Sequence, residues 1–495
     1  MDGRALGSFM SDHHGRDDEI TGEFALDRDG KFLALRMTGY GNVGAYLSTV
    51  APQPPSMNLV RNACGVYRFP AFEVSTKVVF TNTSPVSAYR GAGRPEANMY
   101  IERLIDEAAR QMKIDRFELR RRNHVKPSEI PYKNQAQMTV DSGDFGTVFE
   151  KALEAGDVKG FSKRKEESKK RGKLRGLGVS NSIERAAGAG IEGAEIRFDR
   201  AGTATLLSGS VTQGQGHETV FKQLVCDKLG LHPDDVRYVQ GDTDKVFFGT
   251  GTGGSRTAAI CGSAFNQAAD RIIEKAKKIA AHMWNVDAAD IKLDEGIFSS
   301  TKSNQTITMK ELARKAINPK NVPVDLDAGL IANSVFRTEV ANYPNGCHVC
   351  EVEIDPETGA IQIVRYSVVD DVGTVMNPLL LKGQIVGGVV QGVGQILMED
   401  IHFDADGQLV SGSFMDYAMP RASDLSPVEV KSNPVPTKTN PLGIKGAGEA
   451  GCVGALPAVS SAIADALAPL GIRHVEMPAT PERVWRAIQE SRTQA

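Results

Sequence analysis

Residues 445–451 read Lys-Gly-Ala-Gly-Glu-Ala-Gly and place a single carboxylate among small residues. Glycine allows a backbone to approach a ligand closely and to adopt conformations that other residues avoid. A glutamate on such a turn, ahead of a helix, could meet an anionic cofactor or a reacting atom. Residue types alone favour the alternative, that Glu449 is a solvated turn residue, so the rest of the chain must decide between the two interpretations.

The composition is that of a folded globular protein without a strong charge preference. The 495 residues are enough for about three domains, or for two large ones. A hydrophobic content of 41% with 24% charged residues excludes disorder as the main state. The net charge of −3 argues against nucleic acid or an anionic membrane as the main partner. The 50 glycines fall in clusters, which predicts tight loops around a ligand.

The six cysteines are too sparse for a disulfide scaffold. Cys347 and Cys350 have CxxC spacing, but no second pair completes a metal site, and residues 351–354 predict a strand. We therefore expect a structural role for both. No run approaches 18 apolar residues, so no membrane span is expected. Residues 1–4 lack the apolar core of a signal peptide, and the expected location is the cytoplasm.

Hydrophobic periodicity predicts strands and helices in an irregular order. Alternating or β-branched segments predict strands over residues 23–35, 72–80, 194–198, 204–207, 236–239, 346–354 and 361–369. Helical spacing and capping residues predict helices from 95, after 115, after 217, over 262–283, after 308, over 386–398 and 456–467, and from 481. This order predicts an α+β fold with two layers rather than a parallel βαβ series.

A charged run divides the chain. Residues 163–175, KRKEESKKRGKLR, contain eight basic and two acidic residues. A nucleic-acid patch would need a larger basic face than the chain offers, so a solvated helix end and interdomain linker is the better interpretation. We predict a first domain over residues 1–160, a charged linker over 161–175 and a second domain over 176–495.

Glycine-rich loops lie where helices are expected to begin, near residues 90, 215, 254 and 447. Backbone amides at helix starts, with Gln, Ser and Thr side chains, can hold a large phosphorylated cofactor. GxGxxG occurs three times, but no copy has the strand, helix and acidic residue of a Rossmann site. The P-loop, HExxH and GxSxG patterns are absent. The four loops together favour a cofactor site over ordinary loop-to-helix junctions.

Seven segments are distinctive in their joint order. They are FMSDHHGRD (9–17), TNTSPVSAYRGAGRPEA (81–97), TQGQGHET (212–219), TGTGGSRT (250–257), VDDVGTVMNP (369–378), GQIVGGVVQG (383–392) and NPLGIKGAGEAG (440–451). With these segments the chain resembles the molybdenum-binding large subunit of the xanthine dehydrogenase / aldehyde oxidase / aerobic carbon monoxide dehydrogenase family over nearly its whole length. The resemblance implies two elongated mixed α+β domains of the molybdopterin-binding type, with the cofactor between them.

The resemblance also implies a molybdenum–pterin cofactor, in bacterial members usually molybdopterin cytosine dinucleotide. It makes Glu449 the catalytic base, and it leaves the molybdenum to the pterin, with no protein side chain as a metal ligand. The implied cofactor-binding residues are Arg90, Gly91 and Ala92 beside the metal; Gln213, Gly214, Gln215, Gly216 and His217 around the pterin and phosphates; Thr252, Gly253, Gly254, Ser255, Arg256 and Thr257 as a cradle; Gln384; and Lys445, Gly446, Ala447 and Gly448 lining the metal.

The implied partners are a 2Fe–2S subunit and an FAD subunit, because the chain lacks a cysteine set for an iron–sulfur cluster. Two positions depart from subfamily patterns. Gly91 stands where carbon-monoxide-oxidising members carry a cysteine, and Ala92 stands where xanthine-type members carry an aromatic residue. Both departures favour hydroxylation of an aldehyde or an N-heterocycle, and xanthine or carbon monoxide dehydrogenase activity remains the alternative.

The start of the sequence also differs from the family pattern. Family subunits carry a preceding domain and a further Gly-rich loop upstream of the segment that matches residues 9–17. We therefore expect the C-terminal portion of a large subunit, with an incomplete first domain and a separate N-terminal fragment as a further partner. The alternatives are a non-catalytic remnant or assembly module and, more weakly, a flavin- or nicotinamide-binding protein.

Overall fold

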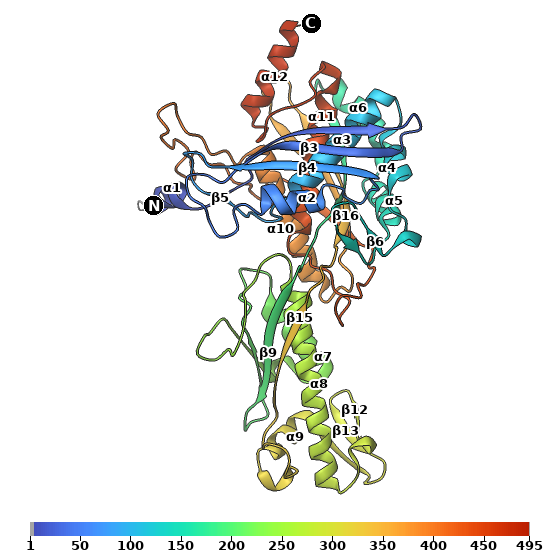
Figure 1. Cartoon of the computed structure of the whole chain (residues 1–495), viewed down its shortest axis with the longest axis vertical. Helices are drawn as coiled ribbons and strands as arrows, with labels where there is room; N and C mark the ends of the chain where they lie inside the picture. The colour runs from blue at the N-terminus through green and yellow to red at the C-terminus, as the bar shows by residue number, and fades with distance from the viewer. Residues whose placement is uncertain (1–3, 495) are drawn as a thin grey trace.

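The computed structural model describes residues 4–494. Residues 1–3, on which the expected lack of a signal peptide partly rests, lie outside the described residues. The chain forms a broad body and a narrower arm that extends from one side of it (Figure 1). Helices and strands are mixed along the chain, as the α+β prediction requires.

The first sheet of the body has three strands, β2 (Asp18–Leu26), β3 (Phe32–Asn42) and β4 (Ala71–Val79). β2 and β3 are antiparallel, whereas β3 and β4 are parallel. The single strand predicted over residues 23–35 is wrong, because a turn separates β2 from β3. In that turn the Asp27 carboxylate accepts the backbone N–H groups of Asp29 and Lys31.

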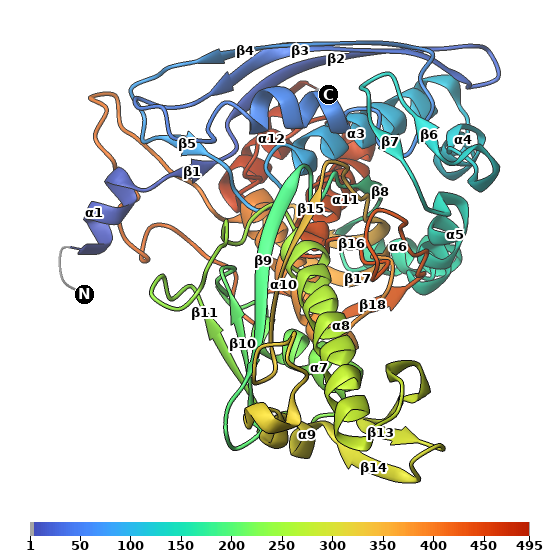
Figure 2. The same ribbon diagram turned by 60° about the horizontal axis from the view of Figure 1, so that its bottom comes forward.

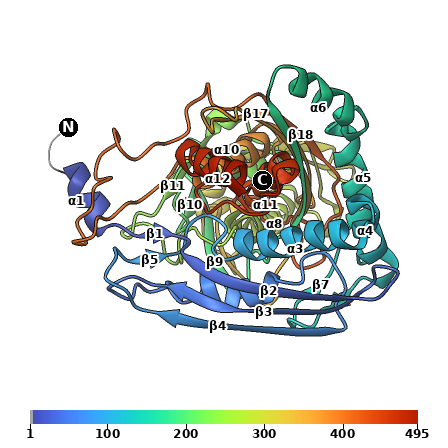
Figure 3. The same cartoon turned by 90° about the horizontal axis from the view of Figure 1, so that it is seen from above.

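Helix α3 (Arg94–Met112) packs beneath this sheet, which covers it as a layer in Figures 2 and 3. Its apolar face carries Ile101, Ile105 and Ala109, all buried at the spacing of successive helical turns. These side chains share a core with Phe32 and Leu35 of the sheet. This packing fixes the position of the start of α3, which directly follows the Gly-rich loop after Tyr89.

The second sheet runs through the middle of the body. Its strands, in spatial order, are β18 (Val428–Ser432), β17 (Ile361–Asp371), β16 (Asn345–Ile354) and β8 (Leu174–Ile183). Two buried helices pack in one core with it, α10 (Pro378–Leu397) and α11 (Ala450–Leu467). Two others, α5 (Phe145–Ala155) and α6 (Phe161–Lys170), pack against it in a separate core.

Helix α11 approaches β8 closely because two strand residues are glycines. A Cβ atom at Gly176 or Gly178 would stand 2.0 or 1.9 Å from the carbonyl oxygens of Ala462 and Ala458. Within residues 4–494, Ala450–Leu470 is the helical segment that is long and apolar enough to cross a membrane, and 72% of its apolar window is buried. The expectation that no segment is long and apolar enough to cross a membrane is therefore wrong. Because most of this segment is buried, its apolar character is explained by packing in the core.

The charged run lies on α6 and the start of β8. Its arginines face acidic residues of β16: Arg164 and Arg175 pair with Glu351 at 2.5 and 2.7 Å, and Arg171 pairs with Glu353. Phe149 of α5 shares a buried core with Val349 of the second sheet. The domain division at 161–175 therefore remains a proposal, since α5 already packs on the sheet of the predicted second domain.

Cys347 and Cys350 both lie on β16, as predicted, and both are free and buried. Residues three apart on a strand point to opposite faces. Cys347 accordingly belongs to the core on the α5 face and Cys350 to the core on the α11 face. The CxxC spacing therefore does not bring the two sulfur atoms together, which agrees with a structural role.

The arm is built on a four-stranded sheet with strand order β11 (Val236–Gln240), β10 (Ala204–Ser208), β9 (Gly190–Phe198) and β15 (Ile331–Thr338). Helices α7 (His217–Leu229) and α8 (Thr257–Trp284) cover it. Helix α8 begins five residues before the predicted start. The tip of the arm carries β12 (Lys292–Asp294), β13 (Ile297–Ser300), β14 (Gln305–Thr308) and α9 (Met309–Ala316).

The remaining elements are short or peripheral. They are α1 (Arg4–Ser11), β1 (His14–Gly15), α2 (Leu59–Asn62), β5 (Val86–Ser87), α4 (Arg116–Asn123), β6 (Tyr132–Lys133), β7 (Thr139–Val140) and α12 (Pro481–Gln494). Asp115 caps α4 by accepting two backbone N–H groups, as the sequence predicts.

Candidate active site

A cavity of about 450 Å³ lies between residues of the arm, on α7 and α8, and residues of the body, on α10 and ahead of α11. Residues at or next to the first turns of four helices line it: α7, α8, α10 and α11. The N-terminus of a helix presents free N–H groups and a partial positive charge. Four such ends around one cavity suit a large ligand with several anionic groups.

The structure brings most of the predicted site residues to this cavity. The lining includes Glu449, Arg90, Gln213, Gly214, Gln215, His217, Thr252, Gly253, Gly254, Ser255, Arg256, Thr257, Gln384, Lys445, Ala447 and Gly448. Four predicted residues, Gly91, Ala92, Gly216 and Gly446, are within one or two residues of lining residues in the sequence but do not line the cavity themselves. These residues come from five regions that are far apart in the sequence, so the tertiary structure alone assembles them.

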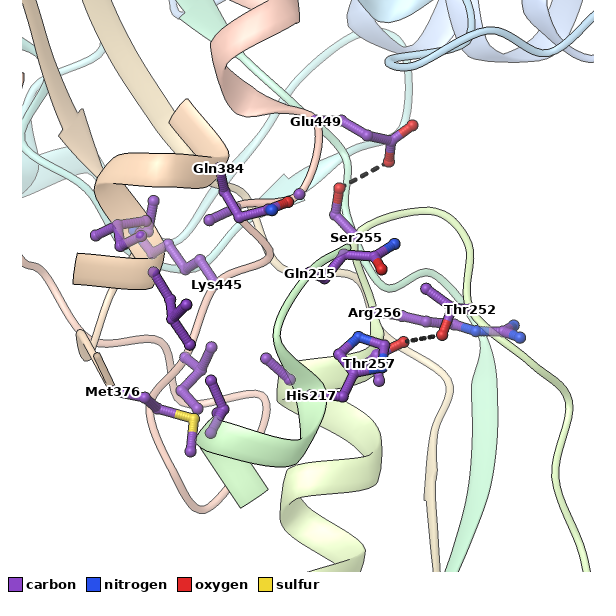
Figure 4. A pocket seen from close by; sticks show the side chains of 18 of the residues that line it. Gln215, His217, Thr252, Ser255, Arg256, Thr257, Met376, Gln384, Lys445 and Glu449 are labelled. Carbon is purple, nitrogen blue, oxygen red and sulfur yellow. Dashed lines mark hydrogen bonds between the residues drawn. The ribbon is translucent and has the colours of Figure 1, made fainter. Parts of the chain in front are cut away.

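Glu449 immediately precedes α11 and has both carboxylate oxygens engaged. Its Oε1 accepts the backbone N–H of Gly91 at 2.8 Å. Its Oε2 accepts the hydroxyl of Ser255 at 2.7 Å, the bond drawn between these two residues in Figure 4. Arg94 Nη1 lies 3.9 Å from Oε1. Burial opposes ionisation, but Arg94 and the hydrogen bonds outweigh it and hold the pKa of Glu449 below its usual value. Glu449 is therefore a carboxylate at neutral pH.

Lys445 and Gly446 anchor the segment before Glu449 to the body. The Lys445 ammonium bonds to Asp371 Oδ2 at 2.6 Å and to the Ser142 carbonyl at 3.2 Å, and both members of the ion pair are fully buried. The backbone N–H of Gly446 donates to Asn342 Oδ1 at 2.9 Å. The Lys445 ammonium is thus paired with Asp371 inside the protein. Together with the bonds to Ser142 and Asn342, this pair fixes the position of the segment before Glu449.

Arg90 joins α10 to the same segment. Its Nε donates to the Gly448 carbonyl at 2.7 Å, its Nη1 to Gln391 Oε1 at 3.0 Å and its Nη2 to the Gln384 carbonyl at 3.0 Å. Arg16 donates to the carbonyl of Arg90 from the other side. The Arg90 guanidinium therefore orients the wall that carries Glu449 as well as lining the cavity.

Residues 212–217 form a second wall that is bonded mainly to itself. Gln215 Oε1 accepts the backbone N–H of Gln213 at 2.6 Å, and Gln215 Nε2 donates to Gln213 Oε1 at 2.8 Å. A Cβ atom at Gly214 would meet nothing within 4 Å. The Nδ1 atom of His217 is buried without a hydrogen-bond partner among the described residues, and burial lowers the pKa of this ring. His217 therefore offers a neutral ring nitrogen for a ligand.

Residues 250–257 form the third wall. Glu192, fully buried on β9, accepts the N–H and the hydroxyl of Thr250 at 3.0 and 2.6 Å. Arg256 donates to the carbonyls of Thr250 and Gly251, both at 2.9 Å. A Cβ atom at Gly253 or Gly254 would meet nothing within 4 Å, so this stretch of backbone is open to a close-lying ligand.

These features fit a phosphorylated pterin cofactor. Unobstructed glycine backbone and amide side chains suit polar ring edges, and the convergent helix ends suit phosphates. His217 supplies an orphaned buried nitrogen. Within residues 4–494, no group of three or more His, Cys, Asp or Glu side chains is placed to hold a metal ion.

Several residues that shape the site were missed by sequence reasoning. Arg94 and Asp371 hold Glu449 and Lys445, and residues 374–377 line the cavity. All of these residues lie within the distinctive segments 81–97 and 369–378, and their place in those segments is the sequence signal that could have identified them. Glu184, beside Glu449, lies outside those segments, and nothing in the sequence pointed to it.

Comparison with known proteins agrees with the site. Two molybdopterin cofactor-binding domain families match the chain, one over residues 6–124 and the other over residues 151–426. The chain is 35% identical over 477 residues to the 6-hydroxypseudooxynicotine dehydrogenase complex subunit gamma of Paenarthrobacter nicotinovorans, covering 94% of this chain and 59% of that protein. It is 34% identical to the carbon monoxide dehydrogenase large chain of Hydrogenophaga pseudoflava, covering 96% and 61%.

Solved structures share the fold. The chain superposes on quinoline 2-oxidoreductase from Pseudomonas putida 86 with a TM-score of 0.92 and 33% identity, over 98% of this chain and 64% of that one. It superposes on carbon monoxide dehydrogenase from Oligotropha carboxidovorans with a TM-score of 0.92 and 31% identity, over 99% and 63%. The chain thus spans about three fifths of the length of the relatives it matches.

Proposed function

Since this chain belongs to the family of molybdenum-binding large subunits of xanthine dehydrogenase, aldehyde oxidase and aerobic carbon monoxide dehydrogenase, we propose that it is the catalytic subunit of a molybdenum hydroxylase. The reaction is the oxidation of an aldehyde or an N-heterocycle with oxygen derived from water. The observation that carries this proposal is Glu449, an ionised carboxylate at the wall of a cavity whose glycine loops suit a pterin.

The cofactor, when bound, supplies the two-electron redox chemistry. Residues 213–217, 252–257 and 445–448 with Gln384 would hold it, and its dinucleotide form would place phosphates near the helix ends. The protein supplies the base. Each oxygen of Glu449 accepts one hydrogen bond and keeps a further lone pair for a proton. Gly91 and Ser255 fix the carboxylate, so it can take that proton from the attacking oxygen nucleophile without reorientation.

The substrate class is proposed from the loop after Arg90. A Cβ atom at Gly91 would lie 2.3 Å from Pro95 Cγ, so a cysteine of the kind that carbon-monoxide-oxidising members carry could not stand here without rearrangement. Ala92 offers no aromatic surface for stacking on a purine. Relatives named nicotine 6-hydroxylase and quinoline 2-oxidoreductase support an N-heterocycle. Oxidation of carbon monoxide or xanthine is the less favoured alternative.

The partners follow from the electron balance. Two electrons must leave the site for each turnover, and the six cysteines within residues 4–494 are all buried and free. We propose that a 2Fe–2S subunit and an FAD subunit accept the electrons, and that the complex is cytoplasmic. Relatives named as a gamma subunit and as large chains support a complex of several subunits.

The test is to co-express the chain with candidate 2Fe–2S and FAD subunits from the same genome in a host supplied with molybdate. The purified complex is expected to contain molybdenum, to release a cytidine nucleotide on acid treatment, and to hydroxylate quinoline in H₂¹⁸O with ¹⁸O in the product. A folded complex without molybdenum would overturn the proposal and would favour a non-catalytic remnant. Molybdenum with activity on an aldehyde and none on quinoline would change the substrate class only.

A further inference from the structure

A second carboxyl group, Glu184, lies beside Glu449 in the interior. Glu184 follows β8 directly and is only 1% exposed. Neither of its carboxyl oxygens has a hydrogen-bond partner among the described residues. A buried carboxylate without partners would cost several kcal/mol of desolvation, so this arrangement demands an explanation.

The charges around the pair do not balance if both groups are ionised. The charged side chains that face Glu184 are Glu449 ahead of α11 and Arg94 at the start of α3. Both terminal nitrogens of Arg94 donate to backbone carbonyls, Nη1 to Gly91 at 3.0 Å and Nη2 to Arg185 at 2.9 Å. The neighbouring Arg185 is itself destabilised as a cation, since burial lowers its pKa. The Arg94 guanidinium is therefore shared between the buried carboxyl groups of Glu184 and Glu449, and its single charge cannot balance both.

The hydrogen bonds decide which carboxyl carries the charge. Glu449 receives the Gly91 N–H, the Ser255 hydroxyl and the nearer approach of Arg94, and a carboxylate is stabilised by such donors. Neither oxygen of Glu184 accepts a hydrogen bond among the described residues, and Arg94 and Ser255 favour its charged form less than burial and Glu449 oppose it. Burial and the adjacent Glu449 carboxylate raise the pKa of Glu184 well above its usual value. Like-charged carboxyls in one site divide their protons in this way.

We propose that Glu184 is a positioning residue that stays protonated at neutral pH and donates its O–H toward Glu449. This inference rests on the proposed role of Glu449 as the base. A neutral acid at this place adds a donor to the Glu449 carboxylate without adding a competing charge. It thereby keeps Glu449 ionised and correctly turned before substrate arrives, and it sets the lower end of the pH range in which the base works.

The decisive comparison is Glu184→Gln against Glu184→Leu. Glutamine has the shape of a protonated glutamate and keeps an N–H donor, so this variant should retain kcat/KM within about threefold and the same acid limb of the pH profile. Leucine fills similar volume without a donor. It should lower kcat/KM by about tenfold, the effect of one lost hydrogen bond to a charged group, and move the acid limb to higher pH. Equal losses in both variants, or loss in Glu184→Gln alone, would overturn the proposal.

Two readouts on the full chain need neither molybdenum nor turnover. The infrared spectrum at neutral pH should show a protonated carboxyl C=O band that shifts in D₂O and is absent in Glu184→Gln. The matched control is Asp18→Asn, because burial raises the pKa of Asp18 to about 8 and its own carboxyl band must be separated from that of Glu184. A difference spectrum between the wild type and Glu184→Gln without this band would contradict a protonated Glu184.

The second readout is thermal unfolding against pH. A carboxyl whose folded-state pKa is raised binds a proton in the folded state that the unfolded chain releases, so its stability contribution is lost as pH rises. The Tm of Glu184→Gln minus that of the wild type should therefore increase from about pH 5 upward. A difference that stays flat or decreases above pH 5 would mean that Glu184 is ionised, whatever the activity of Glu449.

Discussion

Two glycine-rich walls of the same cavity are held in different ways. The 445–449 wall is bonded to residues from across the chain, among them Asp371, Asn342 and Ser255. The 212–217 wall is bonded mostly within itself, through Gln213 and Gln215, and is more exposed. The comparison shows that two loops of similar glycine-rich composition can differ in rigidity. The 445–449 wall is fixed in place for catalysis, whereas the 212–217 wall can adapt to a bound ligand.

The largest expected effect tests the rigid wall directly. In Glu449→Gln the wall keeps its shape but loses the base, so kcat/KM should fall by about 10²- to 10⁴-fold, the usual contribution of a general base. The molybdenum content should stay unchanged, as measured by elemental analysis of the same preparation.

The matched control is Glu218→Gln, an exposed carboxylate in the first turn of α7 that does not line the cavity. It should change kcat/KM by less than about twofold. Loss of molybdenum in Glu449→Gln would reassign Glu449 to a structural role and would remove the functional contrast between the two walls.

The next effect is on stability. Asp371→Asn leaves the fully buried Lys445 ammonium without its counter-charge, and breaking a buried pair costs about 3–5 kcal/mol. The free energy of unfolding from urea titration measures this loss. The exposed pair of Arg486 with Glu482 is the control, and Glu482→Gln should cost less than about 1 kcal/mol. Equal costs at the two places would mean that the wall is not rigidly anchored.

The third effect concerns pH. The depressed pKa of Glu449 keeps it ionised above that pKa, and activity is lost as the pH falls through it. Ser255→Ala removes one donor and should move the acid limb of kcat/KM to higher pH. On the acid side kcat/KM should fall about 10- to 100-fold, equivalent to the 1.5–3 kcal/mol of a hydrogen bond to a charged group.

Ser413→Ala is the control for this pH effect, because Ser413 donates to the carboxylate of Asp416 in the same way at an exposed place, at 2.6 Å. Its pH profile should match that of the wild type. An unchanged acid limb in Ser255→Ala would mean that the Ser255 hydroxyl does not tune Glu449.

The smallest effect on stability is expected in the adaptable wall. Gln215→Ala removes bonds that the loop makes with itself at the surface, so the free energy of unfolding should change by less than about 1 kcal/mol. Retention of the cytidine nucleotide through dialysis should nevertheless fall, by about tenfold. Gln135→Ala, at an exposed loop, should change neither quantity. A large loss of stability in Gln215→Ala would make the two walls alike.

Much of the fold could be predicted because its signals are local. Asp115 and Thr308 cap their helices as expected, and β16 and β17 lie over the predicted segments. The two failures had different origins, one local and one tertiary. The strand over residues 23–35 hides a turn that an Asp27 side chain stabilises, and the apolar length of α11 depends on the glycines of β8 that accept it.

The sequence by itself determined the glycine loops, the helix starts and the family resemblance, and through them Glu449 and most of the lining. The loops and helix starts follow from residue type and spacing along the chain, whereas the assignment of Glu449 and of the lining follows from the resemblance. The tertiary structure alone decided that Lys445 turns inward to Asp371, that Arg90 braces the wall, and that Glu184 faces Glu449. The reason is physical. Whether a charged side chain binds a ligand, pairs with another or gives up its charge depends on burial and on neighbours from distant parts of the chain.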